Sequence, residues 1–158
     1  MGNIFSGSEI VEMGIQIEKN GYDFYTILIE KARKPKAAEI FKFLAGEEEK
    51  HIAVFTSMLD SVREYTPPES YPGEYLAYMS GLASEYVFTQ KDKGKDIAKK
   101  IKSDNEAMDL GIKFEKDSII FYEGMKKAIP EYDLKIVDKL IEQEQHHLKM
   151  LTDLKHAL

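Results

Sequence analysis

The chain has 158 residues, of which 43% are hydrophobic and 32% are charged, with a formal net charge of −6 and no cysteine. This length fits a single domain over residues 1–158, and the acidic balance without a basic stripe argues against binding to nucleic acid or to a membrane surface. The lack of cysteine excludes disulfides, thiolate zinc sites and iron–sulfur clusters, and no apolar run approaches the roughly 18 residues that span a bilayer. With no secretory signal visible either, we expect a cytoplasmic protein.

Apolar residues recur at steps of three and four along most of the chain, which predicts helices. Four long helices are expected, over about residues 8–34, 35–64, 104–129 and 131–156. The first and third follow the S-x-x-E capping boxes that begin at Ser6 and Ser103, and Pro35 and Pro130 suit the starts of the second and fourth. No stretch alternates convincingly with a period of two, so the sequence predicts an all-α fold.

The region over about residues 65–103 is expected to cross from the second long helix to the third. The segment 66–73 contains three prolines and a glycine and breaks the helical pattern. Helical signals resume over about residues 74–88 and again over 96–101, with an interruption at 91–94. We therefore expect a four-helix bundle with a long helical crossover between its second and third long helices.

The two halves of the chain repeat one pattern. Gly14-Ile15, Glu18-Lys19 and Phe24-Tyr25 recur 97 residues later as Gly111-Ile112, Glu115-Lys116 and Phe121-Tyr122, and Leu44, Glu48 and His51 recur 96 residues later as Leu140, Glu144 and His147. The repeat makes each pair of helices the counterpart of the other pair.

Each long helix carries one glutamate in the middle of its apolar stripe, and two helices add a histidine three residues later. These residues are Glu18, Glu48, His51, Glu115, Glu144 and His147. A single E-x-x-H pair is a weak signal, because glutamate is common on helix surfaces and one buried glutamate can pair with a lysine. Four carboxylates in one dry core would repel strongly unless cations balanced them. The repeated pattern therefore predicts a site for two divalent metals, and carboxylate plus imidazole ligands suit iron or manganese.

Neighbouring residues with similar chemistry are assigned to other roles. Glu47 and Glu49 flank Glu48 but leave the stripe, so we interpret them as surface charge, and the repeat likewise rejects Glu142 and His146. Tyr25 and Tyr122 lie two turns beyond Glu18 and Glu115. They either fill the core or donate hydrogen bonds to ligand carboxylates.

With Glu18-Lys19-x5-Tyr25, Glu48-x2-His51, Glu115-Lys116-x5-Tyr122 and Glu144-x2-His147, the chain resembles the ferritin-like di-iron carboxylate proteins, and within them the rubrerythrin-like group. The resemblance implies a ferritin-like bundle with two iron ions, manganese or zinc being the alternatives. It also implies reduction of hydrogen peroxide or dioxygen, with electrons from a donor such as rubredoxin. We expect a homodimer.

Two features depart from typical rubrerythrins. Without cysteine there is no fused rubredoxin domain, so electrons would come from a separate protein. Rubrerythrins also carry an extra glutamate three residues after the third-helix ligand, where this chain has Ser118, and the remaining ligand set looks more like the bacterioferritin centre. An iron-oxidising storage protein and a non-redox metal-binding bundle therefore stay open as alternatives.

Overall fold

The computed structural model describes residues 7–63, 65 and 73–157. Its regular elements in these ranges are all helical, as the sequence predicts. In chain order they are α1 (Gly7–Lys31), α2 (Pro35–Arg63), α3 (Glu74–Glu85), the short 3-10 helix η1 (Val87–Thr89), α4 (Lys93–Lys100), α5 (Asp104–Met125), the 3-10 helix η2 (Lys126–Ala128) and α6 (Glu131–Ala157). The predicted cap at Ser6 and most of the predicted break at 66–73 lie outside the described residues.

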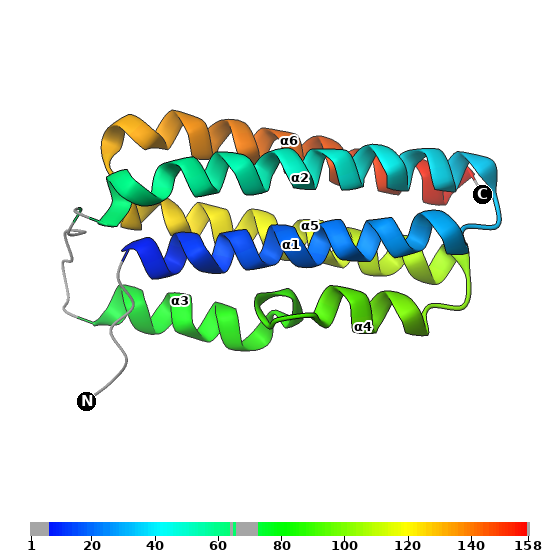
Figure 1. Ribbon diagram of the computed structural model, residues 1–158, viewed down its shortest axis with the longest axis horizontal. Coiled ribbons are helices and arrows are strands. Elements are labelled where there is room, and N and C mark those ends of the chain that lie inside the picture. The colour runs from blue at the N-terminus through cyan, green and yellow to red at the C-terminus, as the bar shows by residue number, and fades with distance from the viewer. Residues whose placement is uncertain (1–6, 64, 66–72, 158) are drawn as a thin grey trace.

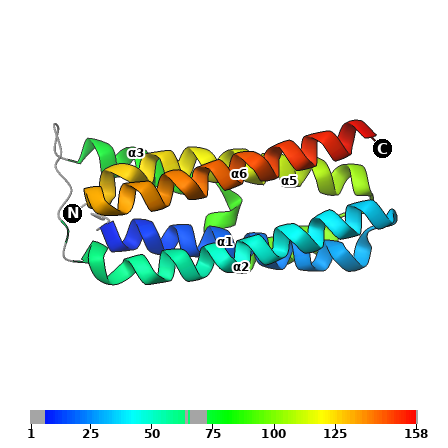
Figure 2. The ribbon, with the colours of Figure 1, turned by 90° about the horizontal axis from the view of Figure 1, so that it is seen from above.

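The four long helices run side by side as two antiparallel pairs, α1 with α2 and α5 with α6 (Figures 1 and 2). The crossover lies along the side of the bundle that α1 and α5 form, where α3 contacts α5 and α4 contacts α1. None of the helices in the described ranges is both long and apolar enough to cross a membrane. This architecture is the all-α bundle with a helical crossover that the sequence predicts.

The turn between α1 and α2 comes earlier than the sequence suggests. The sequence predicts a first helix that ends near residue 34, but α1 ends at Lys31. The next amides instead bind the start of α5, where the backbone N–H groups of Arg33 and Lys34 each donate to the carboxylate of Asp104 at 3.0 Å. This contact holds the α1–α2 turn against the second half of the chain.

The start of α5 agrees with its predicted capping residue. The hydroxyl of Ser103 accepts a hydrogen bond from the backbone N–H of Glu106 at 3.1 Å, while the Glu106 carboxylate accepts one from the N–H of Lys102. These contacts satisfy amides that have no partner within the helix.

The crossover is tied to α1 by one buried side chain. Asn20 donates to the carbonyls of Phe88 and Gln90, at 2.6 and 2.7 Å, and accepts from the N–H of Gly94 at 3.0 Å. Gly94 packs so closely that a methyl group there would lie 2.0 Å from the Asn20 carbonyl oxygen. The predicted helix over 74–88 accordingly ends at Glu85, because the following segment turns to meet Asn20.

Candidate metal centre

The six predicted ligands meet in the middle of the bundle. Glu18 comes from α1, Glu115 from α5, and the Glu/His pairs Glu48–His51 and Glu144–His147 come from α2 and α6; none of the six is more than 2% exposed. By contrast, Glu49, Glu142 and His146 are exposed, as the sequence predicts from the apolar stripe for Glu49 and from the repeat for the other two.

The six side chains form two overlapping groups. Glu18, Glu48, His51 and Glu144 bring one ligand atom each to within 4.8 Å of one another, and so do Glu48, Glu115, Glu144 and His147. Glu48 and Glu144 belong to both groups. This arrangement could hold two neighbouring metal ions, with two shared carboxylates and with one carboxylate and one imidazole specific to each group.

The imidazoles turn the same nitrogen toward the carboxylates. His51 Nδ1 lies 2.8 Å from Glu144 Oε1 and 3.5 Å from Glu18 Oε2. His147 Nδ1 lies 3.4 Å from Glu144 Oε2, 3.6 Å from Glu48 Oε1 and 3.7 Å from Glu115 Oε2. The two rings stack at 5.8 Å between centroids with 18° between their planes.

Many buried polar atoms of this cluster have no partner other than each other, although buried polar groups in proteins are nearly always paired. Within the described part of the chain, no hydrogen-bonding partner outside the cluster is found for Glu18 Oε2, Glu115 Oε2, either oxygen of Glu48 and Glu144, or the Nδ1 atoms of His51 and His147. All of these are donor atoms of the kind that iron and manganese take. The residues therefore fit a metal pair.

Without metal, the close packing of these buried groups shifts their pKa values. Burial, followed by the charges of neighbouring glutamates, raises the pKa values of Glu48 and Glu115 well above their usual range. Burial opposes charge on the histidines, but the surrounding carboxylates outweigh it and raise the pKa of His51 to about 11 and that of His147 to about 10. Metal binding must displace these protons.

Tyr25 and Tyr122 tie each half of the chain to the other. The Tyr25 hydroxyl, on α1, donates to Glu115 Oε1 on α5 at 2.7 Å, and the Tyr122 hydroxyl, on α5, donates to Glu18 on α1. Both rings are fully buried, so each tyrosine packs in the core and also binds a carboxylate of the cluster. Of the two roles that the sequence allowed, the structure supports both.

The assignment of Glu47 to the surface is wrong. Its side chain is only 15% exposed, and its Oε2 lies 4.0 Å from Nε2 of His147. The equivalent contact on the other side is made by Gln143, whose Oε1 lies 2.9 Å from Nε2 of His51. Gln143 was not predicted, although it occupies the position of Glu47 in the 96-residue repeat.

Ser118 occupies the position at which typical rubrerythrins carry an extra glutamate, so this chain has no carboxylate there. Ser118 is buried, and its hydroxyl donates to the carbonyl of Phe114 at 2.9 Å. The repeat places Gly21 at the equivalent point of α1, so both halves carry a small residue one turn after the ligand glutamate.

Comparison with known proteins agrees with this geometry. A family model described as rubrerythrin matches residues 9–155. The chain belongs to the rubrerythrin family. Its structure is similar to that of a candidate ferritin-like diiron-carboxylate protein from Thermotoga maritima, with a TM-score of 0.68 and 27% identity over 99% of this chain and 98% of the other. A search of curated proteins found no match.

Proposed function

We propose that this rubrerythrin-family protein binds two iron ions between its six buried ligands and reduces hydrogen peroxide or dioxygen with electrons from a separate donor. The proposal depends on one observation, the set of buried carboxylate oxygens and imidazole nitrogens that have no other partner in the described chain. Manganese and zinc are the competing metals, since both accept the same ligand atoms.

When bound, a pair of iron ions supplies two electrons as both ions go from ferrous to ferric, enough to convert one hydrogen peroxide and two protons into two water molecules. The protein side chains would balance the charge of the ions and form hydrogen bonds to their ligands. The shared carboxylates of Glu48 and Glu144 balance the charge of both positions. The hydroxyls of Tyr25 and Tyr122 keep their protons, because burial and then the adjacent carboxylates raise their pKa values well above 10.0.

The electrons must come from outside these residues. The 158 residues contain no cysteine, so they cannot form the iron–sulfur site of a rubredoxin. A separate one-electron carrier of the rubredoxin type is the donor we propose.

Rapid mixing tests this function. Protein loaded anaerobically with two equivalents of ferrous iron is mixed with one equivalent of hydrogen peroxide or with dissolved dioxygen, and iron oxidation is followed by absorbance. We expect oxidation faster than that of free ferrous iron, and turnover when reduced rubredoxin is added. Oxidation slower than free ferrous iron with both oxidants would refute the proposal. Iron uptake far beyond two per chain would instead support storage.

A further inference from the structure

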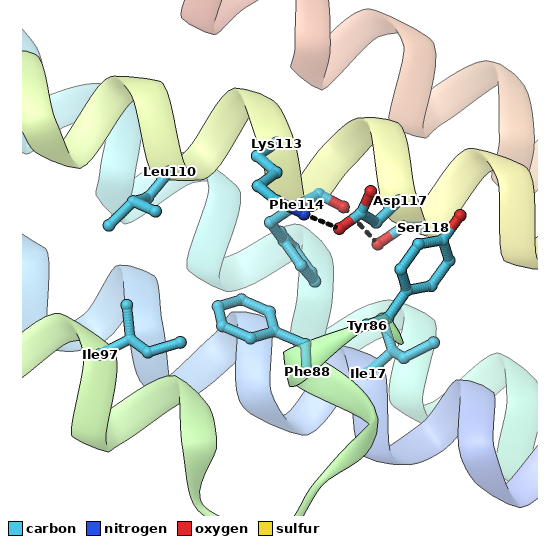
Figure 3. A pocket seen from close by; sticks show the side chains of 9 residues that line it. All are labelled: Ile17, Tyr86, Phe88, Ile97, Leu110, Lys113, Phe114, Asp117 and Ser118. Atoms are coloured by element: carbon cyan, nitrogen blue, oxygen red, sulfur yellow. Dashed lines mark hydrogen bonds and ion pairs between the residues drawn. The ribbon is translucent and has the colours of Figure 1, made fainter. Parts of the chain in front are cut away.

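A small pocket of about 110 Å³ lies between α5, α1 and the crossover (Figure 3). Apolar side chains from all three parts form most of its lining: Ile17 from α1, Leu110 and Phe114 from α5, and Phe88 and Ile97 from the crossover. The rings of Phe88 and Phe114 pack together with 4.6 Å between their centroids. None of these residues is among the metal ligands, so the pocket is distinct from the centre itself.

The polar groups of the lining are few, and three of the four have partners. Lys113 and Asp117 form an ion pair at 2.8 Å, with the exposed lysine at the solvent side, and the hydroxyl of Ser118 is bonded to the Phe114 carbonyl. Tyr86, a partly exposed residue, is the fourth polar member of the lining. A ligand that needs several hydrogen bonds would therefore find little to bind.

The pocket and the metal centre share one wall. Ile17 and Phe114 immediately precede the ligands Glu18 and Glu115. The link is closest at Gly21, where a methyl group would lie 2.6 Å from the ring of Phe114 and 3.1 Å from Oε2 of Glu48. The ring of Phe114, which lines the pocket, and a ligand oxygen of Glu48 thus both pack next to the backbone of Gly21, so this wall of the pocket lies close to the cluster.

The small size and mostly apolar lining of the pocket favour a small apolar ligand. Organic substrates occupy sites of about 300–1,000 Å³, and a dry apolar cavity of about 150 Å³ holds benzene or xenon. At about 110 Å³ this pocket suits a molecule of a few atoms. Hydrogen peroxide would lose hydrogen bonds to water on entering such a site, whereas dioxygen has none to lose.

We propose that the pocket bounded by Phe88, Leu110 and Phe114 binds dioxygen beside the metal centre. This inference rests on the proposed function and makes it more specific. Of the two proposed oxidants, dioxygen is the one that would approach the metal centre from the crossover side of the bundle. The small residue Ser118 is consistent with this proposal, because a glutamate at that position would add a charged carboxylate to the pocket lining.

The test fills the pocket without touching a ligand. Leu110→Phe and Ile97→Phe enlarge side chains on two walls, and Ile136→Phe makes a matched change on α6, where the side chain is 39% exposed. Xenon binding, measured by anomalous diffraction from crystals under xenon pressure, reports on the pocket independently of iron. Oxidation of the ferrous protein by dioxygen and by hydrogen peroxide reports on its role, after metal stoichiometry confirms an intact centre.

We expect xenon in the wild-type pocket and in Ile136→Phe, and little in the two filled variants. Oxidation by dioxygen should slow about tenfold in the filled variants, which is ~1.4 kcal/mol in the barrier, while oxidation by peroxide changes less than about twofold. A wild-type pocket without xenon, equal slowing with both oxidants, or no slowing would overturn the inference. If neither oxidant oxidises the wild type, the proposed function fails, whereas xenon binding still tests the pocket.

Discussion

Nε2 of His51 lies 2.9 Å from the side-chain oxygen of Gln143, and Nε2 of His147 faces the carboxylate of Glu47 at 4.0 Å. Each imidazole therefore has behind it the residue that precedes the ligand glutamate in the other half of the chain, although only Gln143 lies within hydrogen-bonding distance. A partner at Nε2 places the proton there and leaves Nδ1 free for a metal. The two metal positions share one ligand pattern, but one histidine faces a neutral amide and the other a carboxylate.

Replacing Glu47 with Gln is expected to weaken metal binding about tenfold, because a carboxylate behind a ligand histidine raises its basicity. Glu49→Gln removes the same charge from the exposed neighbour and is the control. Competitive titration with cobalt(II) or zinc(II) measures the affinity of each position. Equal effects of the two variants would show that Glu47 acts only through overall charge.

Replacing Tyr25 or Tyr122 with Phe is expected to destabilise the protein by ~1–3 kcal/mol, because a buried carboxylate then loses its donor. Each hydroxyl donates across the two halves, to Glu115 and to Glu18 respectively. Urea unfolding of the metal-free protein measures the loss. Tyr132→Phe, at a side chain that is 70% exposed, should change nothing and controls for the loss of a hydroxyl.

Replacing Glu48 with Gln is expected to have opposite effects with and without metal. The pKa of Glu48 is raised by burial and by neighbouring glutamates, so a neutral amide relieves the metal-free cluster and should raise its thermal midpoint near neutral pH. The same change removes a ligand shared by both positions, so added manganese(II) should no longer raise the midpoint. A metal-dependent rise equal to that of the wild type would contradict the shared role.

The metal-free protein should lose stability as the pH rises above about 6.5. The folded-state pKa values of His51 and His147, about 11 and about 10, lie above the ordinary value of 6.5, so the folded state holds more protons than the unfolded state in this interval. The stabilisation is complete below the unfolded value and disappears as the pH passes through the folded values. The folded-state pKa values of Glu48 and Glu115 are also raised, so these two residues add to the loss of stability at higher pH.

Urea midpoints of the metal-free protein at several pH values from about 6.5 to about 9 measure this loss. The extra stability from added metal should instead increase over the same interval, because protons compete with the metal for the imidazoles. A metal-free midpoint that rises with pH would contradict the assignment of protonated histidines.

Replacing Gly94 with Ala is expected to destabilise the protein by ~1–3 kcal/mol, the usual cost of overpacking. The new methyl group would meet the backbone oxygen of Asn20 at 2.0 Å and push the crossover away from α1. Gly81→Ala is the control, since a methyl group there meets nothing within 4 Å. Hydrogen exchange of α4 and η1 should speed up in Gly94→Ala and stay unchanged in Gly81→Ala.

The sequence alone was sufficient to identify the four long helices and the ligand candidates. Helix faces follow from spacing within one segment, and a glutamate in an apolar stripe is visible without any knowledge of its neighbours. The repeat then separated Glu144 and His147 from the adjacent Glu142 and His146, and the exposure of those two residues agrees with that choice. The family resemblance and the all-α bundle followed from the same local patterns.

Only the tertiary structure decided which groups meet across the helices. Tyr25 reaches Glu115, Gln143 reaches His51, and Phe114 closes a pocket beside Gly21. Helical periodicity tells which way a residue points on its own helix, but not which residue of another helix it meets. That choice depends on how α1 packs against α5 and α2 against α6. For this reason the sequence predicts that Glu47 is surface charge, whereas in the fold Glu47 lies beside His147.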